Sequence, residues 1–309
     1  MIPRSQHMVK SRFCRACTAL AALTVSGWQL WQLSPPAMAL SGVPGVSAFY
    51  TFPPAPAALI VDVFLREKGI SEDAIKAVEK FVDLPALENR GDACKKMNPQ
   101  GSIPWFVTSE GTVVAETIAM CEYMEDVMPE PALVGSSAAE RGITRMWQRR
   151  LEEHFCSPAT YAHRNWCHSD DCPSDHDMKN FYTRRFNAEQ GSNLLYSQPA
   201  AWKDLAAWAL NRVAWLESAK QDEARSGGKP TPSDFICGDK LTMVDIQVYV
   251  NMFYWDTFCP GQYFFKTLDG KIPWVKAWYD RMHARPAVAA ARTYAGYKDL
   301  SDKSDMDTA

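Results

Sequence analysis

The sequence predicts two domains, a small α/β domain followed by an all-helical domain. Short β-prone runs occur only before residue 116, and helical patterns dominate after residue 140. Between them, residues 129–135 contain two prolines and a glycine and are expected to form a linker. A chain of 309 residues is long for one compact domain and comfortable for two. We therefore expect one domain at 46–128 and a second at 136–297.

The elements of the first domain follow from local patterns. Residues 47–52 are β-prone and end at a proline cluster, and helical periodicity covers 57–68 until Gly69 stops it. The remaining expected elements are a strand at 77–82, a loop with a short helix at 83–97, strands at 103–107 and 112–114, and a helix at 116–126. This order of strands and helices is typical of a thioredoxin-like domain.

The second domain contains no strand candidate. The expected helices cover about 140–165, 178–190, 200–220, 242–258 and 272–284. Thr242 and Asp245 have the spacing of a capping box, which predicts that a helix begins there. Polar residues with several glycines and prolines predict a surface loop at 221–235, and the polar tail at 298–309 is expected to be disordered.

The composition is that of an ordinary globular protein, with 47% hydrophobic and 22% charged residues. The net charge is −3 and no segment concentrates Lys and Arg, so nucleic acid is not an expected partner. Nine cysteines, an odd number, argue against a closed disulfide framework. One group has spacings compatible with a metal site, but it lies in a polar insertion and fits no zinc pattern, so no metal is predicted. The group is His163, Cys167, His168, Cys172 and His176.

Residues 1–39 differ from the rest of the chain. They carry four basic and no acidic side chains, a mildly apolar run at 16–33, and an A-x-A pattern at 37–39. These features predict a cleavable targeting presequence, secretory or organellar, with a disordered tail as the alternative. Polar residues interrupt the apolar run, so no membrane span is expected in the mature chain. The scattered thiols favour an organelle or the cytoplasm as the final compartment.

A candidate peptide-binding turn covers Asn98-Pro99-Gln100-Gly101-Ser102-Ile103-Pro104. A proline that opens a strand after a glycine turn is a candidate cis bond, because cis costs an X–Pro bond only about 0.5–1 kcal/mol. A cis bond would turn the N–H and C=O of Ile103 outward, where they could pair with a peptide ligand as an added strand. An ordinary trans turn is the alternative.

Glu116 and Thr117 come directly after a strand and open a helix. Thr117 could hold a carboxylate through its hydroxyl and its backbone N–H at the positive end of that helix. Glu116 could pair with an ammonium group. Side by side, the two residues match the charged groups of an amino acid; simple helix capping is the alternative.

Taken together, these motifs resemble the glutathione transferase superfamily over about residues 47–290. The resemblance is best to its theta/delta-like and bacterial branches. The resemblance implies the glutathione transferase fold, a thioredoxin-like domain followed by a helical bundle. The segments that carry it are NPQGSIP at 98–104, GTVVAETIAMCEYME at 111–125, RMWQRRLEEH at 145–154 and GDKLTMVDI at 238–246.

The resemblance also implies roles for particular residues. Ile103 before a cis Pro104 would meet the cysteinyl backbone of glutathione. Glu116 and Thr117 would hold its γ-glutamyl end, with Thr117 in place of the commoner serine. The basic pair Lys95-Lys96 lies in a region that can approach the glycyl carboxylate, although a solvated charge pair explains it equally well.

The chain departs from the superfamily where the thiol-activating residue is expected. Matching Phe49-Tyr50-x-x-Pro53-x-x-Pro56 to the serine-type pattern places Ala55 at that position, and alanine cannot donate a hydrogen bond. Residues 40–93 contain no cysteine, which disfavours thiol exchange through a mixed disulfide. Tyr50 and Thr51 are the remaining catalytic candidates. Backbone N–H groups at the helix start, and packing of Tyr50 beneath the sheet, are the alternatives.

The resemblance implies an enzyme of detoxification that conjugates the glutathione thiolate to small hydrophobic electrophiles, with glutathione as co-substrate and the protein as a homodimer. The electrophile is expected against Met146–Tyr161, where three aromatic side chains offer apolar surface. Ala55 favours a non-catalytic binding or assembly module instead. A glutathione-dependent peroxidase or disulfide reductase is the third alternative. The three aromatic residues are Trp147, Phe155 and Tyr161.

Overall fold

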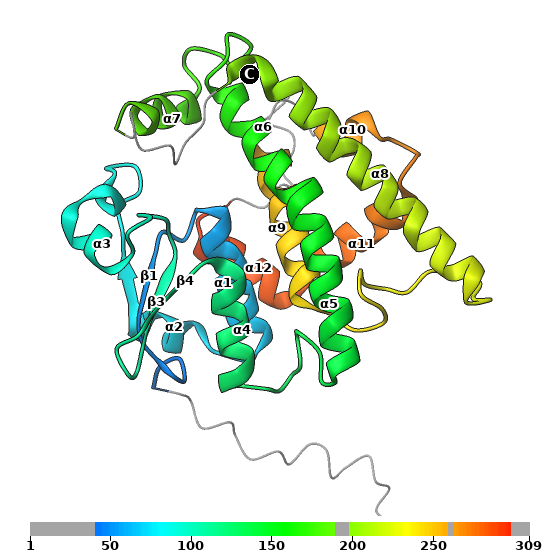
Figure 1. Cartoon of the computed structure of the whole chain (residues 1–309), viewed down its shortest axis with the longest axis horizontal. Helices are drawn as coiled ribbons and strands as arrows, with labels where there is room; N and C mark the ends of the chain where they lie inside the picture. Colours follow the sequence, from blue (N-terminus) through cyan, green and yellow to red (C-terminus); the bar gives the residue numbers. More distant parts are fainter. Residues whose placement is uncertain (1–40, 189–197, 259–262, 298–309) are drawn as a thin grey trace, which may run out of the picture. The chain divides into compact units, whose positions relative to one another are not determined.

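The structure, a computed structural model, describes residues 41–188, 198–258 and 263–297. The predicted presequence at 1–39 and the predicted tail at 298–309 lie outside the described residues. The described part is a four-stranded mixed sheet with its own helices, followed by a helical domain (Figure 1). The predicted fold class, α/β followed by all-α, is confirmed.

The sheet has the strand order β2-β1-β3-β4, in which β1 and β2 are parallel and the other neighbours antiparallel. Phe49 lies opposite Phe106 in the register of β1 and β3, and Tyr50 lies opposite Trp105. Because successive side chains of a strand point to opposite faces, these two pairs belong to different faces of the sheet. The strands are β1 (Val46–Thr51), β2 (Glu79–Phe81), β3 (Trp105–Thr108) and β4 (Val113–Ala115).

Helices cover both faces of this sheet. Phe49 and Phe106 pack into the main core, to which α1 and α4 contribute buried side chains. Tyr50 and Trp105 belong to a smaller cluster on the other face, together with Cys94 of α3. Figure 1 shows α1 and α4 on one side of the sheet and α3 on the other. The helices are α1 (Pro56–Glu67), α2 (Glu72–Val78), α3 (Asp92–Met97) and α4 (Thr117–Val127), with a 3-10 turn η2 (Glu88–Arg90).

The strand predicted at 77–82 is shorter than expected, because helix α2 occupies its first two residues. Ser71 caps this helix by accepting a hydrogen bond from the N–H of Ala74 at 3.2 Å. Two acidic residues in its first turn stabilise the helix, because their negative charges lie at its positive end. These capping signals at 71–74 were readable in the sequence and override the β propensity that follows.

The rest of the chain is helical, as predicted. The single helix expected at 140–165 is two helices joined without a break by a π-helical segment, and α8 extends into the loop expected at 221–235. Helices α10 and α12 were not predicted. Among the described helices, none combines the length and apolar character needed to cross a membrane. The elements are α5 (Ala138–Leu151), η3 (Glu152–Cys156), α6 (Ser157–Cys167), α7 (Asp177–Ala188), η4 (Pro199–Ala201), α8 (Trp202–Ser226), α9 (Met243–Phe258), α10 (Tyr263–Thr267), α11 (Pro273–His283) and α12 (Pro286–Tyr294).

The predicted capping box at the start of α9 is present. Asp245 accepts hydrogen bonds from both the hydroxyl and the backbone N–H of Thr242, each at 2.9 Å. Its other carboxylate oxygen accepts from the backbone N–H of Ile236 at 2.8 Å and from the indole of Trp278 at 2.9 Å. The carboxylate is fully buried, so one side chain fixes the start of α9 and ties it to α11.

Helix α1 connects the two domains. It packs against α4 of its own domain and against α9 and α12 of the helical domain. After α1, the buried ammonium of Lys68 pairs with Glu125 of α4 and donates to the carbonyls of Met128 at 2.8 Å and Pro131 at 2.6 Å. Glu125 in turn accepts from two backbone N–H groups of the linker. The linker is therefore held in place by buried polar contacts.

Candidate functional site

Two neighbouring cavities of about 520 Å³ each lie between the sheet domain and the helical domain. The first, here called the polar pocket, is bounded by the 98–104 loop and the start of α4 on one side and by α5, η3, α6 and α9 on the other. The second, here called the aromatic pocket, is bounded by the start of α1 and by α6, α7 and α9. Ile103, Pro104, Glu116 and Thr117 all line the polar pocket.

Side chains around the 98–104 loop fix its shape. Asn98 donates to the carbonyl of Ser102 at 2.9 Å, and Asn89 donates to the carbonyl of Gly101 at 2.6 Å. Gly101 has a φ of +59°, and a Cβ there would come within 2.8 Å of the Asn89 carbonyl, so only glycine fits. The Ile103–Pro104 bond is cis, as the sequence suggested. The sheet register begins at Trp105, so the backbone of Ile103 lies just beyond the paired strands.

Glu116 and Thr117 stand at the opening of α4, on the same wall of the polar pocket. Glu116 is exposed and has a φ of +69°, a conformation that non-glycine residues rarely adopt. Such backbone outliers cluster at ligand-binding positions. Thr117 is the first residue of α4, where the backbone N–H has no partner within the helix. Together they present a carboxylate, a hydroxyl and a free helix start to the pocket.

The helical domain adds a carboxylate opposite Glu116. Glu152, the first residue of η3, lines the polar pocket and accepts hydrogen bonds from Gln247 and Ser157. Burial raises the pKa of Glu152, and the negative charge of Glu116 adds to this effect. The π-helical turn that places Glu152 here is a feature often found at functional sites. Glu152 lies in the RMWQRRLEEH segment at 145–154, but nothing in that segment assigned it a role at the site.

The basic residue at the polar pocket is not one of the predicted pair. Lys95 and Lys96 are exposed and line neither pocket. Arg90, from the 3-10 turn η2, lines the polar pocket and donates to the carbonyl of Gln100 at 2.6 Å. This arginine precedes the motif in sequence and is brought to it by the fold, so local spacing could not identify it.

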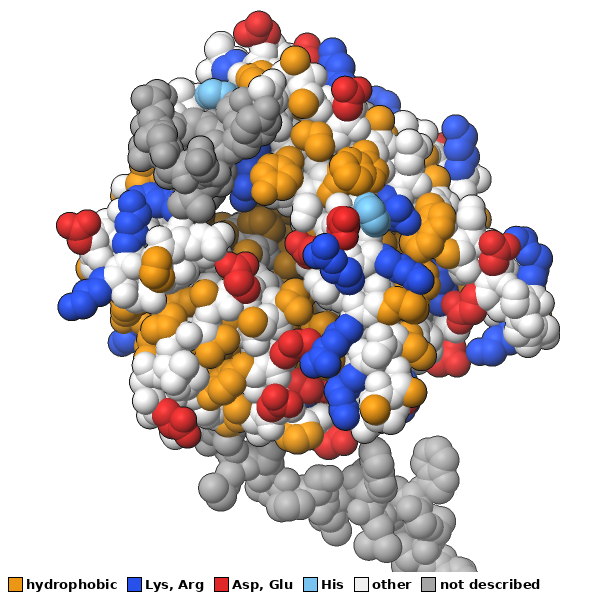
Figure 2. Space-filling view, in the orientation of Figure 1, with side chains coloured by type: hydrophobic (Ala, Val, Ile, Leu, Met, Phe, Trp, Pro, Cys, Tyr) orange, Lys and Arg blue, Asp and Glu red, His pale blue; other side chains and the backbone are white. Residues whose placement is uncertain are grey.

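The aromatic pocket is lined largely by apolar side chains, which come from both the sheet domain and the helical domain. Figure 2 shows a hollow with hydrophobic side chains inside it on the face of the molecule. The electrophile was expected against Met146–Tyr161, but of that segment only Ala159 and Thr160 line the aromatic pocket, and Tyr161 lines the polar pocket. Trp147 packs against Trp215, and Phe155 is buried in the core. The aromatic residues that line the pocket are Phe52, Phe181, Tyr182, Tyr254, Trp255 and Phe258.

The two predicted catalytic hydroxyls lie away from both cavities. Tyr50 stacks on Trp105 with ring centroids 4.8 Å apart, beneath the sheet. Thr51 is buried, with 1% of its surface exposed, and its carbonyl accepts from the N–H of Val82 at 2.9 Å. Neither residue lines a pocket, so the geometry gives no support to a catalytic role for them. Tyr50 therefore packs beneath the sheet, which was the alternative to a catalytic role.

Ala55 lies where the sequence match placed it, next to the pockets. It is the N-cap of α1 and lines the aromatic pocket. The first intrahelical bond of α1 runs from Leu59 to the Ala55 carbonyl, so the N–H groups of Ala57 and Ala58 have no partner within the helix. The positive end of α1 therefore opens on the cavities without a capping side chain.

The His and Cys group of the predicted insertion belongs to the packing of the helical domain. His163 is buried, and this burial, together with the nearby charge of Arg164, lowers its pKa to about 3, so its imidazole is neutral at physiological pH. Cys167 and Cys172 are buried in a small cluster with Trp166. Within the described ranges, no group of three or more His, Cys, Asp or Glu side chains is arranged to hold a metal ion.

Comparison with known proteins identifies the family. The family model described as glutathione S-transferase, N-terminal domain, matches residues 55–127, and that of the C-terminal domain matches residues 200–281. With a sheet domain, a helical domain and two pockets between them, the chain belongs to the glutathione S-transferase superfamily. Members of this family use glutathione.

Several relatives cover most of the chain. Protein LigF of Sphingobium sp. is 26% identical over 250 residues, which is 77% of this chain and 90% of the relative. Glutathione S-transferase 2 of Saccharomyces cerevisiae is 21% identical over 243 residues, 77% of this chain and 86% of the relative.

Solved structures show the same fold. A glutathione S-transferase domain-containing protein of Marinobacter aquaeolei aligns with a TM-score of 0.60 and 23% identity, covering 78% of this chain and 99% of the other. The β-etherase LigF of Sphingobium sp. aligns with a TM-score of 0.60 and 23% identity, covering 80% of this chain and 98% of the other.

Proposed function

We propose that this protein is a glutathione transferase that joins the glutathione thiolate to small hydrophobic, aromatic electrophiles. The observation that carries the proposal is the pair of adjoining cavities, one polar and one aromatic, with a shared wall. A charged tripeptide fits the first, and an apolar ring fits the second.

The polar pocket offers partners for each part of glutathione. Glu116 would pair with the γ-glutamyl ammonium, and Thr117 would hold the neighbouring carboxylate at the start of α4. The backbone of Ile103 would pair with the cysteinyl residue as an added strand. Arg90 would face the glycyl carboxylate. These assignments place the cysteinyl sulfur where the polar pocket meets the aromatic one.

The reaction is a nucleophilic displacement or addition by sulfur. The glutathione thiol first loses its proton to solvent, and the resulting thiolate attacks the electrophilic carbon. A carbon–sulfur bond forms, and in a displacement the leaving group departs with the electron pair of its broken bond. At neutral pH only a few per cent of a free thiol is ionised, so the site must favour the thiolate. The unpaired N–H groups at the start of α1 contribute to this.

A second candidate function is cleavage of an aryl ether by the same thiolate. LigF, which aligns over most of this chain, is a β-etherase. In one step a carbon–sulfur bond forms and the carbon–oxygen bond breaks. The oxygen leaves as an aryloxide, which takes up a proton. The aromatic lining of the second pocket suits an aryl ring on either side of that bond.

One experiment separates these candidates. The purified full chain is incubated with glutathione and either an activated aryl halide or an aryl ether α to a carbonyl, and products are identified by mass spectrometry. We expect a glutathione thioether, with halide released in the first case and a phenol in the second. Thr117→Val should slow both reactions by weakening glutathione binding. Binding of glutathione without turnover of either substrate would favour the non-catalytic module instead.

We also propose that the protein is a homodimer, as in the family it belongs to. Light scattering coupled to gel filtration measures the mass directly, and a value equal to one chain would contradict this.

A further inference from the structure

The two pockets share six lining residues, and only one of them carries a charge. That residue is Arg164, on α6. The others are apolar or neutral polar, so Arg164 is the ionic group at the place where the two pockets meet. The shared residues are Pro56, Ala57, Ile103, Thr160, Arg164 and Asn251.

Arg164 lacks the partners that a partly buried guanidinium usually has. Its Nε is buried and has no hydrogen-bond partner, and no described carboxylate lies within ion-pair distance of the side chain. The guanidinium lies over the ring of Tyr161, whose centroid is 5.7 Å from the guanidinium carbon. A buried guanidinium nitrogen without an acceptor is costly, so this position suits an anion supplied by a ligand.

The charged side chains around this junction leave Arg164 available. In the polar pocket Glu116 and Glu152 are the acids and Arg90 the other base, while Arg184 is the second base of the aromatic pocket. The neighbouring His163 stays neutral because its pKa is lowered to about 3 by burial. Among the described side chains that line the aromatic pocket, none is acidic.

We propose that Arg164 stabilises the thiolate of bound glutathione and so replaces the hydroxyl that Ala55 lacks. This rests on the proposed function, which puts the cysteinyl sulfur beside Ile103 at the junction of the pockets. The thiol proton passes to solvent, the guanidinium N–H groups donate to the sulfur anion, and no bond to the protein forms. An opposite charge within a few ångströms lowers a pKa by about one to three units.

The test is a pH titration of the thiolate absorbance of glutathione bound to the full-length protein. In the wild type, the thiol pKa should lie clearly below that of free glutathione. In Arg164→Met it should rise by about one unit or more, and the conjugation rate below neutral pH should fall about tenfold in proportion. Arg164→Lys keeps the charge and should restore part of the shift.

Two controls keep the outcomes apart. Arg212→Met removes an arginine that likewise lies over an aromatic ring, 4.4 Å from Trp215, but lines neither pocket, so the thiol pKa should not change. S-methylglutathione has no ionisable thiol and should bind Arg164→Met as tightly as the wild type. Failure of the wild type to bind glutathione would refute the proposed function. Binding with the same thiol pKa in Arg164→Met and wild type would overturn the role of Arg164 alone.

Discussion

Arg285 and Glu67 form a bidentate ion pair across the domain boundary. Nε and Nη2 of the arginine donate to the two carboxylate oxygens at 2.6 and 2.7 Å. Glu67 ends α1 and Arg285 immediately precedes α12, so the pair joins segments far apart in the chain. The hydrogen bond to Glu67 raises the pKa of Arg285. With the Glu67 side chain only 10% exposed, this pair is better shielded from water than an ordinary surface pair.

We expect this ion pair to couple the domains measurably. A double-mutant cycle with Arg285→Met and Glu67→Gln should give a coupling free energy of about 1–3 kcal/mol in urea denaturation. The matched control is the exposed pair Lys276–Asp280 within α11, which should give only about 0.3–0.5 kcal/mol. Equal coupling energies for the two pairs would show that burial adds nothing.

Asp245 caps α9 and also binds the backbone of Ile236 and the indole of Trp278 in the helical domain. The Asp245 carboxylate accepts four hydrogen bonds, and Asp245→Ala removes all four. The buried N–H groups of Ile236 and Trp278 are then left without a partner. The free energy of unfolding should fall by about 3–5 kcal/mol. Asp245→Asn keeps one acceptor oxygen and should cost less. If Asp245→Ala is no less stable than Asp245→Asn, the hydrogen bonds accepted by Asp245 do not stabilise the helical domain.

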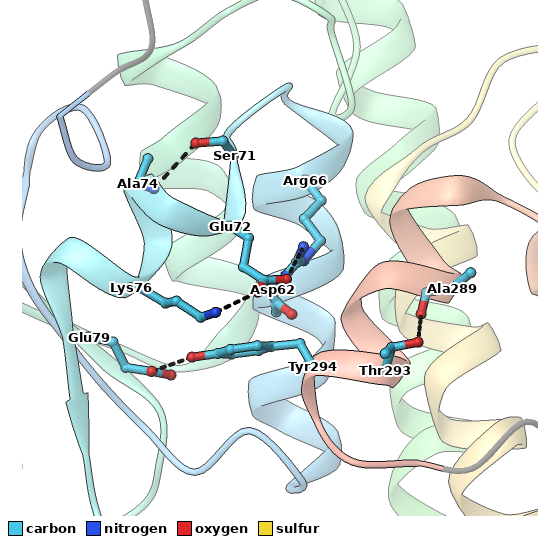
Figure 3. A network of polar contacts seen from close by, with 10 residues as sticks. All are labelled: Asp62, Arg66, Ser71, Glu72, Ala74, Lys76, Glu79, Ala289, Thr293 and Tyr294. Atoms are coloured by element: carbon cyan, nitrogen blue, oxygen red, sulfur yellow. Dashed lines mark hydrogen bonds and ion pairs between the residues drawn. The ribbon is translucent and has the colours of Figure 1, made fainter.

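Asp62 lies in a polar network that joins α1 and α2, and the ring of Tyr294 from α12 lies against Arg66 and Lys76 of that network (Figure 3). Burial raises its pKa to about 6, against the lowering effect of its 3.0 Å bond to Arg66. The folded protein therefore holds this proton between the unfolded pKa of 3.8 and about 6, while the unfolded chain has lost it. The stability from this group is present at low pH and is lost as pH rises through that window.

Asp62→Asn isolates the effect, because asparagine does not titrate. Relative to the wild type, the variant should gain up to about 3 kcal/mol of unfolding free energy between roughly pH 4 and pH 7. Urea denaturation at intervals across this range measures the difference. A difference in unfolding free energy between wild type and variant that does not change with pH would rule out a raised pKa at Asp62.

Ala55 offers a gain-of-function prediction. Its backbone is extended at φ −75° and ψ 139°, the conformation in which serine caps a helix, and no side chain caps α1 now. Ala55→Ser should raise unfolding stability by about 0.5–2 kcal/mol. It should also increase conjugation below neutral pH, since its hydroxyl faces the aromatic pocket. Ala55→Thr and Ala55→Val differ only in the hydroxyl, so equal rates in this pair would exclude a catalytic gain.

The sequence alone predicted the parts of the site that are encoded locally. The 98–104 turn, the cis bond at Ile103 and the helix start at Thr117 each depend on a few neighbouring residues with known backbone preferences. The capping box of Asp245 was predictable for the same reason. Helix α2 was not predicted, although its cap at Ser71 is encoded locally, because the helix is short and runs directly into the β-prone residues of β2.

The remaining site residues depend on tertiary placement. Arg90 reaches the polar pocket only because η2 folds back on the 98–104 loop, and Glu152 because the π-helical turn rotates it there. The aromatic pocket draws on α7 and α9, which are distant from Met146–Tyr161 in the chain, so helical periodicity could not show which aromatic rings face it. Arg164 was not identified for the same reason.

The glutathione site is tested most directly by calorimetry. The binding of glutathione and of the dipeptide cysteinylglycine, which lacks the γ-glutamyl residue, is measured for the wild type and for Glu116→Gln. The exposed Glu116 makes this a conservative change.

We expect the wild type to bind glutathione about tenfold or more tightly than the dipeptide, and Glu116→Gln to lose most of that preference while its dipeptide affinity stays the same. An unchanged preference in Glu116→Gln, or no glutathione binding by the wild type, would contradict the assignment of the polar pocket to glutathione.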